Sequence, residues 1–205
     1  MLTSWLHLPA TGHRRMPWAN GGGTTAEVAT GPHNTGPQHT GPEHSGAWHW
    51  RLSIADVEAD GPFSSLPGID RHILVAHGDG MALSVDGTTH LLRPGEPPFP
   101  FAGEAVTTCR LLGGPINDLN LMVRREQAFG ALRRVHLAAG DTCTPDAADV
   151  AVVLLNGAAE VEGAPLRQFD ALVALGPGDA PTIAATQPTD LAVASVYSRD
   201  AHGLL

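Results

Sequence analysis

Residues 15–27 read Arg15-Met-Pro-Trp-Ala-Asn-Gly-Gly-Gly-Thr-Thr-Ala-Glu27, and this stretch bears most directly on the fold. Three consecutive glycines cost backbone entropy, so they predict a place where the main chain turns with positive φ or passes close to another group. A phosphate-binding loop would need a lysine after its last glycine, whereas Gly23 is followed by two threonines. We therefore predict a strand after the glycines, with Thr25 and Glu27 on one face. A tight loop that leads into β-structure explains the glycines without any ligand.

Composition favours strands over helices. The 205 residues include 24 glycines and 17 prolines, 42% are apolar, and the mean hydropathy is close to zero at -0.03. Lysine, which favours helices, is absent, so all 12 basic residues are arginines. Many short strands joined by turns fit this usage, and we predict an all-β fold. The absence of lysine also excludes a Schiff-base or lysine general-base mechanism.

Charge and cysteine content narrow the classes of partner and compartment. The formal charge of -9 and the isoelectric point near 5.5 argue against nucleic acid or an anionic membrane as a partner, which leaves small molecules and proteins. Cys109 and Cys143 are the only cysteines, so neither a disulfide framework nor a structural zinc site is expected. Pro9 interrupts the first apolar residues too early for a secretory signal, and no apolar run reaches membrane-spanning length. We therefore expect a cytoplasmic protein.

A histidine-rich segment interrupts the strand-like pattern at residues 31–46. It repeats Gly-Pro followed by His33, His39 and His44, and it contains almost nothing that a core could bury. We predict a mobile surface insertion between two strands. Metal binding through the three histidines is the alternative interpretation.

Residues 48–55 alternate in the way of a strand with one buried face. Trp50 and Leu52 fall on one face, and Arg51 and Ser53 fall on the other. In a flat sheet the polar face would meet water, whereas in a barrel it would line the interior.

A second polar row lies near residue 120. If this stretch is extended, Asp118, Asn120 and Met122 share one face, and Leu119 and Leu121 share the other. A polar row of this kind either faces water or lines a pocket. Residue types alone favour water.

Turn signals in the first half recur in the second. Asp86-Gly87 stands between two alternating runs and is among the strongest short-range hairpin signals. The order strand, glycine, strand, acidic-Gly turn, strand, Pro-Gly corner occurs once in residues 73–95 and again in residues 150–178. This echo predicts a duplicated small β-barrel, although hairpin patterns alone can also produce it.

The chain resembles the HutD/Ves family over most of residues 14–125. The segments that match are Arg15 to Glu27 as quoted above, Trp50-Arg-Leu-Ser-Ile-Ala-Asp56, Asp60-Gly-Pro-Phe-Ser-Ser-Leu-Pro-Gly-Ile-Asp-Arg71, Phe99-Pro-Phe-Ala-Gly103, and Gly114-Pro-Ile-Asn-Asp-Leu-Asn120 with Arg124-Arg125. The resemblance implies an RmlC-like cupin fold, as a bicupin with two β-barrel halves. Its N-terminal half would be residues 1–125, with the loop at 31–46, and a more divergent C-terminal half would be residues 126–205. The family is associated with bacterial histidine utilisation, without an established chemistry.

Residues at the expected cupin metal positions argue against a metal ion. Metal-dependent cupins place two His and a Glu before the glycine turn and another His after a Pro-x-Gly corner. Here Gly78 marks the turn, Arg71 stands about where the Glu ligand would be, and the corner at residues 94–99 offers prolines and Phe99 where the last His should come. A cationic side chain would repel the ion, so we predict a metal-free pocket and no cofactor. Nucleophilic catalysis is not supported either, because Ser64 and Ser65 lack the Gly-x-Ser-x-Gly motif of a nucleophile elbow.

Polar residues of the matching segments are expected to converge at one mouth, where a barrel gathers strand ends and corners. The predicted ligand-binding residues are Asn20, Glu27, Asp70, Arg71, Asp118, Asn120 and Arg124. Arg71 or Arg124 would hold a carboxylate, and Glu27 or Asp118 would accept from an amine, imidazole or formimino group. Alternatively, these residues satisfy one another as ion pairs.

The expected function is binding of a small polar or carboxylated metabolite, with a regulatory or protective role in histidine utilisation. A metal-independent enzyme that acts on a histidine-degradation intermediate is the alternative, with Glu27 as acid/base and Arg71 holding a carboxylate. A structural protein–protein module is a third interpretation. Neither nucleic acid nor a membrane is expected as a partner, and a homodimer is compatible with this interpretation.

Overall fold

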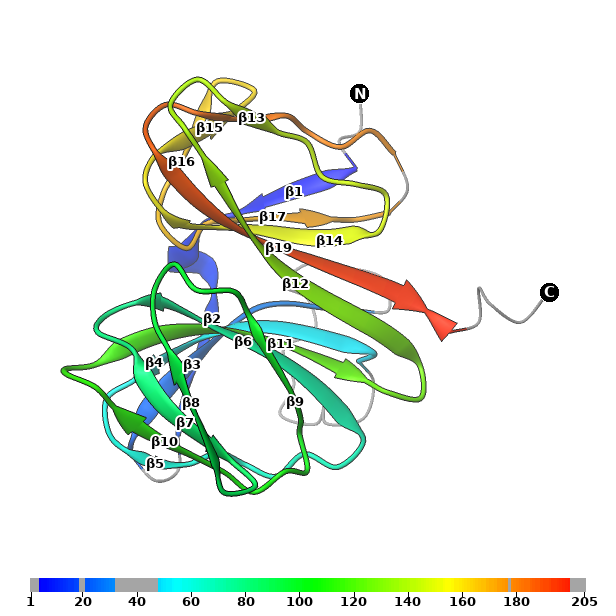
Figure 1. The fold of residues 1–205 in the computed structure, drawn as a ribbon. Coiled ribbons are helices and arrows are strands. Elements are labelled where there is room, and N and C mark those ends of the chain that lie inside the picture. Colours follow the sequence, from blue (N-terminus) through cyan, green and yellow to red (C-terminus); the bar gives the residue numbers. More distant parts are fainter. Residues whose placement is uncertain (1–3, 19–20, 32–47, 177, 200–205) are drawn as a thin grey trace.

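The computed structural model describes residues 4–18, 21–31, 48–176 and 178–199. Over these residues the chain forms nineteen strands and one 3-10 turn, Ala10–Gly12, and no α-helix. Figure 1 shows two halves, each built from facing β-layers, with β12 and β19 extending along the boundary between them. The predicted all-β class is confirmed. The predicted insertion at 32–46 and Asn20 lie outside the described residues.

The N-terminal half consists of a six-stranded sheet and a four-stranded sheet. In spatial order, the six-stranded sheet contains β2 (Arg14–Pro17), β3 (Gly23–Gly31), β4 (Trp50–Val57), β11 (Ile116–Arg124), β6 (Ile69–His77) and β9 (Phe99–Ala102). The four-stranded sheet contains β5 (Gly61–Pro62), β10 (Thr107–Leu111), β7 (Met81–Val85) and β8 (Thr88–Leu92). The strand predicted after the glycines is β3.

The C-terminal half repeats this arrangement with a five-stranded and a four-stranded sheet. The first contains β1 (Trp5–Leu8), β17 (Ala171–Ala174), β14 (Asp149–Asn156), β19 (Thr189–Ser198) and β12 (Ala128–Leu137). The second contains β13 (Thr142–Cys143), β18 (Ile183–Ala185), β15 (Ala159–Val161) and β16 (Ala164–Leu166).

Strand β1 folds with the C-terminal half, although it precedes the whole N-terminal half in sequence. It pairs with β17 in the register Trp5↔Ala174 to Leu8↔Ala171. Trp5 is buried in the apolar cluster between the two C-terminal sheets. Residues 5–8 therefore belong structurally to the second half, and the chain enters the first half only at β2.

Three apolar clusters hold the sheets together. One fills the N-terminal half and a second fills the C-terminal half. The third lies between the six-stranded and five-stranded sheets, where Leu52 and Leu121 of the first half meet Val153 and Ala192 of the second. At Gly130 of β12 the sheets approach so closely that an added Cβ would lie 2.4 Å from a methyl carbon of Val123. The larger sheets therefore form the contact between the halves.

The turn echo predicted from the sequence is present in the backbone. Asp86 and Gly87 have φ values of 48° and 81°, and Glu162 and Gly163 have φ values of 51° and 78°. These paired left-handed residues form the tight turns of two hairpins, β7–β8 and β15–β16. Each half thus contains a hairpin with the same kind of tight turn.

Candidate functional site

The inner face of the six-stranded sheet carries a band of polar side chains. Glu27, Ser53 and Asn120 lie opposite one another on β3, β4 and β11. Two residues beyond Asn120 on β11, Met122 is paired with Arg51 of β4 and with Arg71 of β6. Two residues before Asn120, Asp118 lies opposite Ala55 of β4. Residues in register project from the same face of a sheet. The strand pairing therefore gathers the band from four strands: Glu27, Arg51, Ser53, Arg71, Asp118 and Asn120.

This face is buried, which corrects the expectation that the polar row of β11 faces water. Asp118 is 1% exposed, and Asn120 and Arg71 are each 4% exposed. Residue types could not reveal this, because the cover comes from the four-stranded sheet. Its Leu83 and Cys109 form one apolar cluster with Ile73 of β6. The polar band thus lies inside the N-terminal half.

Several buried polar atoms of this band have no hydrogen-bond partner. Both carboxylate oxygens of Asp118, Oδ1 of Asn120 and Nε of Arg71 are unpaired with respect to the part of the chain that the structure describes. Leaving such groups unpaired costs roughly 1–3 kcal/mol each, more when they are charged, so folded proteins seldom bury them without a reason. The band therefore presents donors and acceptors to a ligand or to water.

Two aromatic rings hold the guanidinium of Arg71. Its Cζ lies 4.9 Å from the centroid of Phe63 and 4.9 Å from that of Phe101. Both contacts are in the range of cation–π attraction, which orients the plane of the group without using its N–H donors. Burial lowers the pKa of Arg71 to about 10, opposed by the nearby charge of Asp118, and the group remains cationic at neutral pH. Its fork stays suited to a planar carboxylate.

Asp118 has an unusual proton affinity. Burial raises its pKa to about 7; the cation of Arg71 opposes this shift, and the charge of Asp56 adds to it. Near neutral pH the carboxyl group therefore exchanges between a neutral form that donates and an anionic form that only accepts. A group of this kind can transfer a proton or match a ligand in either state.

Glu27 and Arg51 form a half-buried ion pair at the edge of the band. Nε of Arg51 lies 3.0 Å from Oε2 of Glu27, although the N–H does not point along a hydrogen-bond direction. Their side chains are 26% and 21% exposed, more than the rest of the band. Arg51 and Ser53 were absent from the predicted site, and the alternation of residues 48–55 was the signal that could have added them.

Two predicted site residues lie apart from the band. Asp70 accepts from Nε of Arg125 at 2.8 Å and projects from the face of β6 opposite to that of its neighbour Arg71. Arg124 donates through Nε to the carbonyl of Trp48 at 2.7 Å and lies 4.9 Å from a Trp48 ring centroid. The band thus brings together four predicted residues: Glu27, Arg71, Asp118 and Asn120. Asn20 is outside the described residues.

The described residues contain no group of three or more His, Cys, Asp or Glu side chains that could hold a metal ion. Arg71 places a positive charge in the N-terminal interior beside Asp118, whose carboxylate is buried. None of the helical structure within the described ranges is long and apolar enough to cross a membrane.

Comparisons with known proteins relate this site to one family. The family model described as HutD matches residues 10–194. A curated relative from Pseudomonas putida, an uncharacterised 21.2 kDa protein in the hutC 3' region, is 43% identical over 120 residues, which is 56% of each chain. Protein Ves from Citrobacter koseri is 37% identical over 125 residues, 58% of this chain and 60% of Ves. These matches thus span a little over half the length of the curated relatives.

Solved structures extend the likeness along the chain. HutD from Pseudomonas fluorescens SBW25 has a TM-score of 0.75 and 32% identity, and the match covers 95% of this chain and 99% of that one. The pirin YhhW from Escherichia coli, solved with nickel(II), has a TM-score of 0.66 at 11% identity, covering 93% of this chain and 98% of the pirin. The second likeness shows the fold alone, which is all-β and cupin-like.

Proposed function

Since this chain belongs to the HutD family, we propose that its N-terminal half binds a small polar or carboxylated metabolite of histidine utilisation, in a regulatory or protective role in the cytoplasm. In this proposal the two halves are the closed barrels of a bicupin, and the ligand enters the first barrel. The pocket uses no metal ion.

One observation carries the proposal: Nε of Arg71, both carboxylate oxygens of Asp118 and Oδ1 of Asn120 are buried on one inner face without a described hydrogen-bond partner. Arg71 would hold a ligand carboxylate through two parallel hydrogen bonds, with its plane set by the rings of Phe63 and Phe101. Asn120 would add a donor or acceptor, and Asp118 would pair with an imidazole or amine N–H. A ligand with a carboxylate at one end and an N–H group at the other satisfies this set.

An enzymatic role on a histidine-degradation intermediate is the second candidate. Asp118 favours it, since a pKa of about 7 is the range in which a general acid/base works best at neutral pH. Asp118 suits that role better than Glu27, because Glu27 already faces Arg51 at 3.0 Å.

Calorimetric titration with urocanate, formiminoglutamate and formylglutamate tests binding, and analysis of the mixtures after incubation tests turnover. Arg71→Lys keeps the charge but loses the planar fork, so binding should weaken by roughly 10- to 100-fold, which is about 1.5–3 kcal/mol, with little change in melting temperature. Arg110→Lys, at an exposed position of β10, is the matched control.

Unchanged affinity together with a lowered melting temperature in Arg71→Lys would make Arg71 a structural residue and remove the site assignment. Product formation in the incubated mixtures would favour the enzyme. Neither binding nor turnover with any of the three compounds would favour a structural interaction module.

A further inference from the structure

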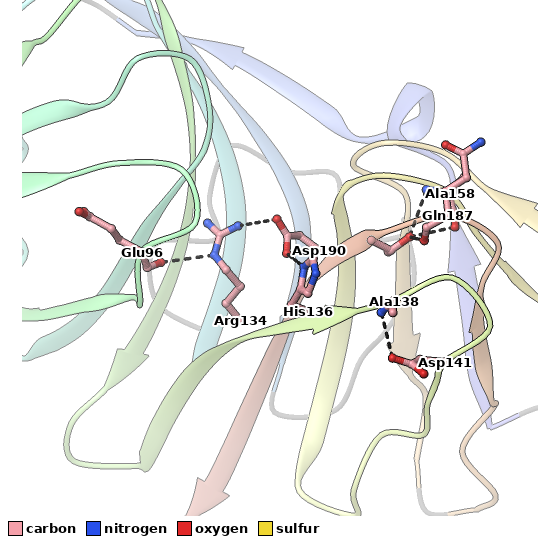
Figure 2. A network of polar contacts seen from close by, with 9 residues as sticks. Glu96, Arg134, His136, Ala138, Asp141, Ala158, Gln187 and Asp190 are labelled. Atoms are coloured by element: carbon pink, nitrogen blue, oxygen red, sulfur yellow. Dashed lines mark hydrogen bonds and ion pairs between the residues drawn. The ribbon is translucent and has the colours of Figure 1, made fainter.

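Arg134 of β12 reaches from the C-terminal half into the N-terminal half. Its NH2 group donates to the carbonyl of Val75 at 2.8 Å, and its Nε donates to the carbonyl of Glu96 at 3.3 Å. The side chain is only 9% exposed. Figure 2 shows the guanidinium between the segment of Glu96 and the side chain of Asp190. A C-terminal side chain thus satisfies two backbone acceptors of the other half.

Both acceptors flank the point where β9 meets β6. The described pairing of these strands runs from Asp70↔Ala102 to Ile73↔Phe99. Val75 lies on β6 just beyond this ladder, and Glu96 lies in the corner that leads into β9. The guanidinium therefore bridges β6 and the incoming chain at the open end of the ladder, where the next backbone pair would otherwise stand.

Strand β9 forms one wall of the candidate site. Phe101 is opposite Arg71 in the ladder, and its ring faces the guanidinium of Arg71 at 4.9 Å. Phe99 stacks on Phe101 with ring centroids 6.1 Å apart. Any shift of β9 along the edge of β6 would move the ring that orients Arg71.

Asp190 and His136 hold Arg134 in place. NH1 of Arg134 lies 3.5 Å from Oδ2 of Asp190, and the other carboxylate oxygen lies 2.9 Å from Nδ1 of His136 (Figure 2). Asp190 and His136 are themselves paired in the β12–β19 ladder. Burial lowers the pKa of Arg134, and the charge of Asp190 opposes this shift. The C-terminal sheet thus aims a charged donor at two neutral carbonyls.

We propose that Arg134 is a positioning residue, through which the C-terminal half anchors β9 and keeps the ring of Phe101 against Arg71. Arg134 contacts the site only through backbone, by its bonds to β6 and to the segment that leads into β9. That Arg134 anchors the backbone of β9 does not depend on the proposed function. That Arg134 affects ligand affinity does depend on it.

Arg133 provides a matched control on the same strand. It projects from the opposite face of β12 and pairs with Asp149 at 2.6 Å within the C-terminal half. The test compares Arg134→Met with Arg133→Met by hydrogen exchange of the β9 amides and by the side-chain Nε–H resonance of Arg71, which the two flanking rings shift by their ring currents.

In Arg134→Met, amide exchange in β9 should accelerate by roughly 10-fold or more, and the Arg71 resonance should move. In Arg133→Met, the exchange rates should stay within about 2-fold of wild type, and the Arg71 resonance should not move. If β9 exchanges faster but the Arg71 resonance stays in place, Arg134 stabilises the edge of the sheet without positioning Arg71, and the proposal fails. Unchanged exchange in a folded Arg134→Met protein overturns it as well.

Arg134→Lys covers the case in which Arg134→Met does not fold. Lysine keeps the charge and the apolar stem but cannot span both carbonyls, so exchange of β9 should be intermediate. Urocanate titration is the separate arm: about 3- to 10-fold weaker binding in Arg134→Met supports the link to ligand affinity. If wild-type protein binds no urocanate while β9 still responds, urocanate is not the ligand and the positioning role stands.

Discussion

Both halves bury a carboxylate between their sheets, but among the described residues only the one in the C-terminal half has hydrogen-bond partners. Asp149 is 4% exposed and accepts from Oγ of Ser195 at 2.5 Å, NH2 of Arg133 at 2.6 Å and the backbone of Asp146 at 2.8 Å. In the N-terminal half, the equally buried Asp118 has no described partner at either oxygen. We call the C-terminal interior closed, because its buried carboxylate is satisfied within that half, and the N-terminal interior open, because Asp118 has no described partner.

An open interior has a physical cost that the rest of the chain must offset. Buried groups without partners destabilise the folded state, and they persist where a ligand or a reaction uses them. The apolar cluster between the larger sheets and the closed C-terminal interior supply stabilisation that does not depend on a ligand. Substitution of a buried carboxylate should therefore lower the free energy of unfolding in the closed interior and raise it in the open one.

The largest effect is expected at the closed site. Asp149→Ala leaves Arg133, Ser195 and a backbone N–H without their acceptor, so the free energy of unfolding should fall by about 3 kcal/mol. Urea unfolding measures this loss. Asp146→Ala is the control, because Asp146 is 86% exposed and lies 3.8 Å from Arg133, and its loss should stay below about 0.5 kcal/mol. Equal losses in the two variants would erase the contrast between the halves.

The open site should respond to pH with the opposite sign. The pKa of Asp118 is raised from 3.8 to about 7 in the folded state, so its ionisation destabilises folding progressively as pH rises from about 4 to 7. Asp118→Asn removes this penalty. Relative to wild type, the variant should therefore gain about 2 kcal/mol more stability at pH 8 than at pH 5.5.

Denaturant titrations of both proteins at the two pH values measure this gain. A stability difference that does not change between pH 5.5 and 8 would mean that Asp118 titrates near its ordinary range. In that case water or another group satisfies it, and the N-terminal interior is as closed as the other one.

The smallest effect is expected from metal removal. Arg71 brings a cation into the open interior beside Asp118, and a cation there repels a metal ion, so the folded protein should not depend on metal. Tag-free, dialysed protein should carry less than about 0.1 equivalent of transition metal, and chelator should leave the melting temperature unchanged. Stoichiometric metal that survives deletion of residues 31–46 would show that the open half is a metal site after all.

Local patterns predicted the strands and turns of this fold better than the sides on which residues lie. The alternation near residue 120 predicted β11, and Asp86-Gly87 predicted a hairpin, because both depend on short-range geometry. Alternation gives the period of side chains but not which face another sheet will cover, so residue types alone favoured water for the face of Asp118. The reach of Arg134 to Val75 depends on packing between halves, which no local pattern contains.

Prediction of the site residues was limited in the same way, because it depends on how strands pair and which faces they share. Glu27, Arg71, Asp118 and Asn120 come together because the register of four strands aligns them. Asp70 was grouped with Arg71 because both are polar residues of one matching segment, yet neighbours on a strand point to opposite faces, and Asp70 pairs with Arg125 instead.

The pairing of β1 with β17 has a consequence for how the protein is made. Trp5–Leu8 leaves the ribosome early, but Ala171–Ala174 is synthesised only after the entire N-terminal half. Because domains fold as their residues emerge, the first half can assemble while the earliest strand still waits for its neighbour. Closing so long a loop is slow, since its entropy is lost before the contact forms. Until β17 is made, the face of β1 that carries Trp5 has no sheet to pack on, so we expect β1 to dock late in the folding of the second half.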